Sequence, residues 1–276
     1  MVRLQSGMVP VIALLTDFGL RDPYVGAMKG AILSACPEAT LADVLHEVPA
    51  HDVLAGALAL DAAYRHFPGG TVFVAVVDPG VGSDRRPIAV GAGRWLFVGP
   101  DNGLFTFVLD AHPSARVHLL ANPLLYREPL SPVFHGRDLF GPVAGRLASG
   151  LPLEEVGPAV ADPVRLALPP KSRTEDGWQG AVVHVDRFGN LTTNLLEADL
   201  RALTGRDLEG LEVSLGGRRL PLVRFYSAVA AGEACALVGS SGRLEIAVNR
   251  GRADALAGGG PGTLVRVRRR ALGVLD

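Results

Sequence analysis

Short apolar runs alternate with longer segments of helical period along the first two thirds of the chain. The expected strands are residues 11–15, 71–77 and 94–98, and the expected helices are residues 24–35, 52–64 and 140–149. Apolar runs of this length are typical of strands covered on both faces, and the helical segments between them supply that cover. The pattern predicts an α/β domain with a central sheet flanked by helices.

The rest of the chain contains short runs of strand character with turn residues between them. These runs are residues 180–185, 211–215, 220–224, 234–238, 243–248 and 262–268. A proline-punctuated segment and the polar run 171–177 separate them from the α/β part. The sequence therefore predicts an N-terminal α/β domain at residues 9–165, a linker at 166–177 and a smaller all-β domain at 178–276.

Four arginines lie close together near the end of the predicted all-β domain. The cluster consists of Arg266, Arg268, Arg269 and Arg270, and it alternates with Val265 and Val267. Alternation of charged and apolar residues is typical of an edge strand that charge protects from unwanted pairing. We therefore expect an edge strand here rather than a basic binding patch.

Charge and composition exclude several classes of protein. The chain has 28 acidic and 27 basic residues, a net charge of -1, so it offers no broad cationic field for nucleic acid. No apolar stretch reaches the roughly 18 residues needed to cross a bilayer, and no export signal is evident. Cys36 and Cys235 are too few for a disulfide framework. We expect a cytoplasmic protein with no nucleic-acid or membrane partner.

Four of the apolar runs lead directly into compact loops rich in Asp, Gly and Asn. These loops are residues 16–19, 78–82, 99–103 and 186–190. Asp and Asn beside Gly are ordinary turn formers, which suffices to explain any single loop. Ligands of open α/β sheets bind outside the carboxyl ends of strands, where such loops converge. Several polar loops of this kind therefore predict a common ligand site.

A further segment carries chemistry that turn formation does not explain. His135, Arg137 and Asp138 place an imidazole, a guanidinium and a carboxylate beside Gly136. An imidazole here is a candidate general base or water-orienting group near neutral pH. Common alternatives are absent from the sequence: no phosphate-cradling loop, no dinucleotide fingerprint, and the wrong spacing of His46 and His51 for a zinc helix.

Collinear blocks carry a family resemblance over nearly the whole chain. The blocks are residues 16–19, 24–30, 78–85, 99–103, 134–138, 186–194 and 239–249. Together they resemble the S-adenosylmethionine hydroxide adenosyltransferases, which are adenosine-forming S-adenosylmethionine hydrolases related to fluorinating and chlorinating enzymes. The resemblance implies an α/β domain followed by a barrel-like β domain, in a homotrimer with its sites at subunit interfaces. It implies no metal and no cofactor, since S-adenosylmethionine is the substrate.

The resemblance also implies roles for particular residues. Asp78, Arg85 and His135 correspond to the catalytic set that orients a water or hydroxide, and either Asp78 or His135 would accept its proton. The residues expected to bind substrate are Asp17 at the ribose hydroxyls, Asp186 at the methionine ammonium, Ser240 and Ser241 at its carboxylate, Phe188 and Asn190 at the adenine, and also His51 and Val248. Two of these positions depart from the halogenating relatives, which have Trp in place of His51 and Arg in place of Ser241.

Three other functions stay open. A halogenase would transfer halide to the same substrate carbon and form a 5′-halo-5′-deoxyadenosine. A metal-dependent phosphohydrolase would use Asp17, Asp78, Asp101 and Asp186 as hard oxygen ligands. A non-catalytic sensor would bind adenosine or S-adenosylmethionine without turnover.

Overall fold

The computed structural model describes residues 9–270 except 206, 209 and 257. The chain divides into two compact units between Leu166 and Ala167. None of the helices in this part of the chain combines the length and apolar character needed to cross a membrane.

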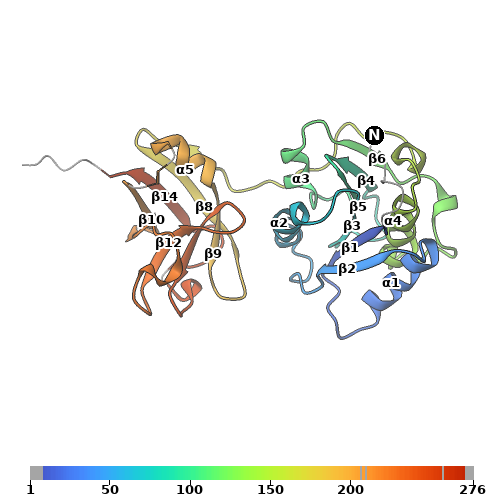
Figure 1. Cartoon of the computed structure of the whole chain (residues 1–276), viewed down its shortest axis with the longest axis horizontal. Coiled ribbons are helices and arrows are strands. Elements are labelled where there is room, and N and C mark those ends of the chain that lie inside the picture. Colours follow the sequence, from blue (N-terminus) through green and yellow to red (C-terminus); the bar gives the residue numbers. More distant parts are fainter. Residues whose placement is uncertain (1–8, 206, 209, 257, 271–276) are drawn as a thin grey trace, which may run out of the picture. The chain divides into compact units, whose positions relative to one another are not determined.

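The first unit contains a six-stranded mixed sheet (Figure 1). Its strands, in spatial order, are β2 (Thr40–Leu45), β1 (Val11–Thr16), β3 (Val72–Val76), β5 (Trp95–Pro100), β4 (Pro87–Ala92) and β6 (Arg116–Leu119). The first four strands in this order run parallel, and β4 runs antiparallel to both of its neighbours. The predicted sheet flanked by helices is thus confirmed, although the sequence analysis missed β2, β4 and β6.

Helices cover both faces of this sheet. Figure 1 shows α1 (Tyr24–Ala35) and α4 (Gly141–Ala148) on one face, and α2 (Val53–Ala63) and α3 (Thr106–Ala111) on the other. Successive side chains of β1 point to opposite faces of the sheet. Ile12 and Leu14 pack in the same core cluster as Met28 and Phe140. Burying each side chain of this size contributes about 1.5–3 kcal/mol.

Short helical turns connect the main elements of the first unit. They are the 3₁₀ turns η1 (Tyr64–His66), η2 (Pro123–Leu125) and η4 (Leu153–Val156), and the π-helical turn η3 (Gly136–Phe140). The turn η3 runs directly into α4. Single π turns within helices are often found at functional sites.

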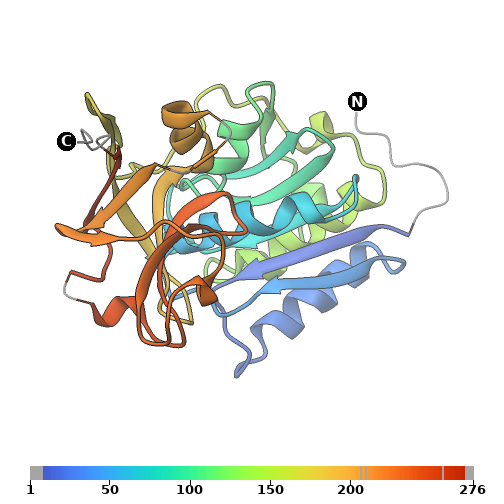
Figure 2. The same ribbon diagram turned by 60° about the vertical axis from the view of Figure 1, so that its left-hand side comes forward.

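The second unit is an antiparallel sheet that is nearly closed into a barrel (Figure 2). Its strands are, in spatial order, β11 (Arg218–Leu220), β10 (Leu211–Leu215), β14 (Leu264–Arg269), β8 (Gly177–Val185), β9 (Leu191–Leu196), β13 (Arg243–Val248) and β12 (Ala234–Val238), with β7 (Ser172–Arg173) paired to β8. After β11, the Val223 N–H donates to the carbonyl of Ala236 in β12 at 2.8 Å. This bond connects the first and last strands of the spatial order. The predicted barrel-like β domain is confirmed, with the addition of α5 (Glu197–Thr204), η5 (Tyr226–Ala228) and η6 (Ala253–Ala255).

Two sequence-based expectations for the second unit are wrong. The strand expected at residues 220–224 is instead β11, because Gly216 and Gly217 have φ of 54° and 90° and close a two-residue hairpin directly after β10. The arginine-rich strand β14 is not an edge strand, since it pairs with β10 on one side and β8 on the other. Arg266 and Arg268 alternate with buried valines and are exposed, and Arg268 forms an ion pair with Glu212.

The first unit also contains a partly buried polar contact between Tyr64 and His112. Tyr64 is fully buried, its ring lies 5.1 Å from that of Trp95, and its hydroxyl lies 3.2 Å from His112 Nε2. Burial, and then the nearby charge of Arg65, lowers the pKa of His112 below the ordinary imidazole value of 6.5.

This lowered pKa predicts a loss of stability in mild acid. Below pH 6.5 the unfolded chain binds the His112 proton more readily than the folded chain. The free energy of unfolding should therefore fall as the pH decreases through 6.5, and above that pH His112 should contribute no pH dependence. Urea unfolding should show that the wild type and His112→Gln differ less in free energy of unfolding at pH 5.5 than at pH 8. The exposed His66→Gln is the matched control, and an equal shrinkage there would contradict the assignment.

Candidate active site

Sheet topology brings Asp17 and two of the predicted catalytic residues, Asp78 and Arg85, to one edge of the sheet in the first unit. Asp17 and Asp78 follow β1 and β3, which are parallel neighbours, so both lie beyond carboxyl ends of strands. Strand β4 begins at Pro87, opposite Pro100 at the end of β5, so the loop that carries Arg85 also lies at this edge. Asp78 and Arg85 therefore meet across one short loop.

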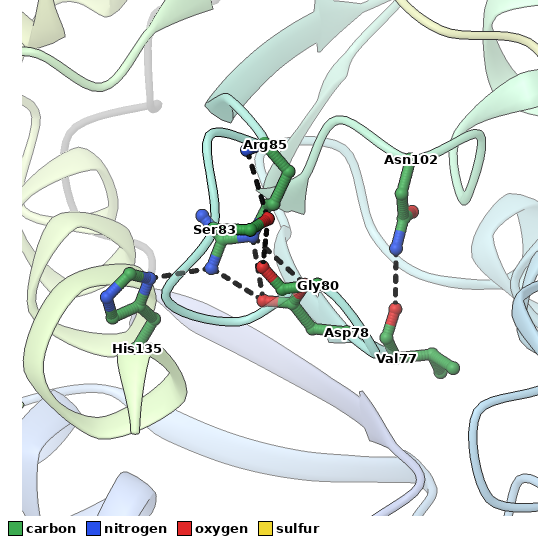
Figure 3. Close-up of polar contacts among 7 residues, drawn as sticks. All are labelled: Val77, Asp78, Gly80, Ser83, Arg85, Asn102 and His135. Carbon is green, nitrogen blue, oxygen red and sulfur yellow. Dashed lines mark hydrogen bonds and ion pairs between the residues drawn. The ribbon is translucent and has the colours of Figure 1, made fainter. Parts of the chain in front are cut away.

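Arg85 joins Asp78 and His135 (Figure 3). Its Nε donates to Asp78 Oδ1 at 3.0 Å and Oδ2 at 2.9 Å, and its Nη2 donates to Oδ2 at 2.6 Å. The same Nη2 lies 2.6 Å from His135 Nδ1. The side chains of Asp78 and Arg85 are only 4% and 9% exposed, so little solvent screens this ion pair.

The arrangement fixes the protonation state of His135. Burial, and then the positive charge of Arg85, lowers the pKa of His135, so the imidazole is neutral at neutral pH. A guanidinium has only donors, so Nδ1 must accept the hydrogen bond and the ring proton lies on Nε2. His135 therefore presents an N–H donor through Nε2.

A second ion pair supports the segment that carries His135. Asp138 is fully buried and accepts from Arg137 Nε at 2.6 Å, from Arg137 Nη2 at 2.7 Å and from the Ser131 N–H at 3.0 Å. Burial alone would raise the pKa of Asp138, but the hydrogen bonds from Arg137 and Ser131 lower it below its ordinary value. Asp138 is thus a fixed anion that joins the π turn to the loop before it.

Asp17 and His51 are also in contact. The His51 N–H donates to Asp17 Oδ2 at 2.9 Å. His51 has a left-handed φ of 68°, and its side chain is 75% exposed. Phe18 places the Asp17 loop beside the His135 segment, because its ring lies 5.9 Å from that of Phe134 and 3.1 Å from where a Cβ on Gly136 would stand.

The sequence analysis missed a partly buried polar network next to the Asp17 loop. His46 is 4% exposed; its Nδ1 lies 2.8 Å from Thr16 Oγ1 and its Nε2 lies 2.9 Å from Asp43 Oδ1. Lys29 donates to the other oxygen of Asp43 at 2.8 Å, and Thr16 Oγ1 accepts from the Phe18 N–H at 3.3 Å. The spacing of Asp43 and His46 is visible in the sequence, but their partners come from β1 and α1, which no local pattern predicts.

The second unit carries the remaining predicted residues. Asp186 follows β8 and accepts from the Asn190 backbone N–H at 2.8 Å and from Asn190 Nδ2 at 3.0 Å. Asn190 is buried, whereas Phe188 in the same loop is 73% exposed. Val248 ends β13 and is half-buried. Asp186, Phe188 and Asn190 thus share one loop, as predicted.

Ser240 and Ser241 occupy the turn between β12 and β13. Next to this turn lies Glu245, a carboxylate that the sequence analysis did not single out: a Cβ on Gly239 would stand 2.0 Å from Glu245 Oε1. Burial, and then the nearby charge of Asp186, raises the pKa of Glu245. The second unit therefore holds two carboxylates within electrostatic reach of each other.

The structure offers no ligand set for the metal-dependent alternative within the described residues. No group of three or more His, Cys, Asp or Glu side chains there could hold a metal ion. Asp78 is paired with Arg85 and Asp101 with Arg86 at 2.6 Å, so two of the four proposed ligands are already neutralised.

Comparisons with known proteins agree with this arrangement. The SAM hydroxide adenosyltransferase N-terminal domain matches residues 12–157 and the corresponding C-terminal domain matches residues 180–266. A Thermus thermophilus protein named (R)-S-adenosyl-L-methionine hydrolase is 43% identical over 93% of this chain and 98% of its own length. A protein of the same name from Salinispora tropica is 43% identical over 94% and 97%, and a fluorinase from Nocardia brasiliensis is 32% identical over 88% and 92%.

Solved structures show the same fold. An uncharacterized conserved protein from Thermotoga maritima superimposes with a TM-score of 0.86 at 34% identity, covering 94% of this chain and 100% of that one. A conserved hypothetical protein from Thermus thermophilus gives a TM-score of 0.77 at 42% identity with the same coverage. The chain therefore belongs to the SAM hydroxide adenosyltransferase family.

Proposed function

We propose that this enzyme hydrolyses S-adenosyl-L-methionine to adenosine and L-methionine. The observation that carries the proposal is the buried cluster in which Arg85 joins Asp78 to His135, in a chain 43% identical to hydrolases of this substrate. An oxygen of water attacks the ribose C5′, the C5′–S bond breaks, and its electron pair stays on sulfur. Methionine leaves as a neutral thioether, so the leaving group needs no proton and the reaction needs no metal ion.

The catalytic set in this proposal holds and activates the nucleophile. Arg85 occupies three of about four lone-pair positions of the Asp78 carboxylate and the only free lone pair of the neutral His135 ring. Asp78 therefore keeps one acceptor position, and His135 offers the Nε2–H as a donor. These features support Asp78 as the proton acceptor and His135 as the group that orients the oxygen behind C5′.

The substrate-binding roles follow the family resemblance. We propose that Asp17 accepts hydrogen bonds from the ribose hydroxyls beside His51, and that Asp186 binds the methionine ammonium. Ser240 and Ser241 would bind the methionine carboxylate. The adenine would be bound by Phe188 and Asn190, with Val248 as a further contact. The exposed ring of Phe188 is consistent with stacking on a base.

The same resemblance supports proposals about the working form of the enzyme. We propose a homotrimer with its sites at subunit interfaces, acting in the cytoplasm without metal or organic cofactor. A halogenase is the second candidate, because the fluorinase from Nocardia brasiliensis is 32% identical over most of the chain. The greater identity to the hydrolases favours water as the nucleophile.

Isotope labelling tests the proposed reaction directly. Incubation with S-adenosylmethionine in water enriched in ¹⁸O should place the label at the 5′-oxygen of adenosine and leave methionine unlabelled. Because the relatives are named for the R configuration at sulfur, both epimers should be supplied separately. Activity should be unchanged by a chelator, and excess chloride should yield no 5′-chloro-5′-deoxyadenosine. Label in methionine, or a halogenated product, would contradict the proposal.

Substitutions of the catalytic set should act on the bound step. Asp78→Ala and His135→Ala should each lower the single-turnover rate at saturating substrate by about 10² or more, while substrate still binds. The double variant should be scarcely slower than either single one, because both residues serve one water and groups that act as a unit are not additive. A folded Asp78→Ala protein with normal chemistry would show that Asp78 is only a turn residue.

Asp186→Asn should separate binding from chemistry. The amide keeps an acceptor for the Asn190 N–H but removes the charge proposed to bind the ammonium. Loss of a charge-assisted hydrogen bond costs about 1.5–3 kcal/mol, so the Kd for substrate should rise about 10- to 150-fold. The saturated single-turnover rate should stay within about threefold of wild type. An equal loss in that rate would contradict the assignment.

A further inference from the structure

The loop that carries Asp78 and Arg85 is anchored at both ends by two adjacent residues. Its flanking residues are Val77 and Arg86, and both contact the dipeptide Asp101–Asn102 after β5. We infer that Asp101 and Asn102 are positioning residues that fix Asp78 and Arg85 relative to the substrate. This inference rests on the proposed hydrolase function.

Asn102 anchors the start of the loop. Its Nδ2 donates to the Val77 carbonyl at 2.8 Å, directly before Asp78 (Figure 3). Its Oδ1 accepts from the Leu104 N–H at 3.2 Å, which fixes the amide orientation. The peptide plane that leads into Asp78 is thereby attached to the neighbouring strand end.

Asp101 anchors the end of the loop. It is 5% exposed, and its Oδ2 accepts from Arg86 Nε at 2.8 Å. Its backbone N–H donates to the Arg86 carbonyl at 2.8 Å, and its Oδ1 accepts from the Val164 N–H at 2.8 Å. Arg86 also donates to Asp162 at 2.8 Å. The residue directly after Arg85 is therefore held by backbone and side chain together.

The interior of the loop explains why external anchors matter. It contains Gly80 and Gly82, and Gly82 has a φ of +77°, a conformation that costs glycine little. The Ser83 hydroxyl donates to the Gly80 carbonyl at 2.7 Å within the loop itself. Arg85 and Asp78 attract each other in many geometries, but catalysis needs one, and a displacement of about 1 Å can cost about 10²-fold in rate.

Two variants of Asn102 test the inference. Asn102→Asp keeps the acceptor for Leu104 and loses the donor to Val77, whereas Asn102→Ala loses both without adding charge. Each should lower the saturated single-turnover rate about 10- to 100-fold and leave the Kd for substrate within about threefold. If only Asn102→Asp lowers the single-turnover rate, the added charge is the cause and the inference is overturned.

Asn122 supplies a matched control in the same unit. It makes the same pair of bonds, from Nδ2 to the Glu155 carbonyl at 3.2 Å and from the Leu124 N–H to Oδ1 at 3.2 Å. Asn122→Asp and Asn122→Ala should lower the melting temperature without lowering the rate per folded molecule. If the Asn102 variants also change only the melting temperature, Asn102 is structural and the inference is overturned.

Arg86→Gln tests the other anchor with less risk of misfolding, because the Arg86 side chain is 33% exposed. It should lower the saturated rate about tenfold. Arg165→Gln, which removes an ion pair with Asp110, is its control and should leave the rate unchanged. An unchanged rate in folded Arg86→Gln would overturn the role of Asp101.

A double variant separates positioning from stability. In an Asp78→Ala background, Asn102→Ala should slow the reaction no further, while its effect on melting temperature should persist. Independent effects on rate would overturn the inference. A wild-type protein that forms no adenosine would overturn the proposed function as well, whereas an active wild type with unaffected Asn102 and Arg86 variants overturns the inference alone.

Discussion

The guanidinium of Arg85, shared between a carboxylate and an imidazole, is the interaction on which the rest of the site depends. An arginine and an aspartate that are both nearly excluded from solvent lose much hydration energy, and such a pair persists only with excellent geometry. The planar guanidinium fork of Arg85 provides this geometry, because it donates to both Asp78 oxygens and to His135 Nδ1 at the same time. A lysine offers no such fork, and without a cation the buried Asp78 carboxylate would be unpaired.

The sheet explains how three residues so far apart in sequence can meet. Parallel β1, β3 and β5 place their following loops along one edge, and the antiparallel return of β4 adds Arg85 to that edge. His135 arrives from a different direction, at the start of the π turn that runs into α4. The apolar core between α4 and the sheet, which includes Phe140 and Val143, therefore also sets the position of the imidazole.

The sequence predicted those parts of the molecule that local pattern determines. The helix at Tyr24–Ala35 has the predicted bounds, because its period and the preceding polar loop are local signals. Strands β2 and β6 were missed because Asp43 interrupts the short apolar run of β2 and β6 has only four residues, so they become strands through their neighbours. The grouping of Asp78, Arg85 and His135 came from family resemblance rather than from spacing. The partners of Asn102 and His46 were not predictable, since each is set by tertiary contacts.

The same hydrogen-bond pattern bears on the choice between water and halide. A halide ion needs only donors, whereas a water molecule that becomes the 5′-hydroxyl must also lose a proton. Arg85 and the His135 Nε2–H are donors suited to either nucleophile, so they do not discriminate between them. We propose that the remaining lone pair of Asp78 accepts the proton from water, whereas its negative charge would repel a halide ion, which has no proton to give. In the proposed mechanism, Asp78 is therefore the residue that selects water, and Arg85 holds its carboxylate in place.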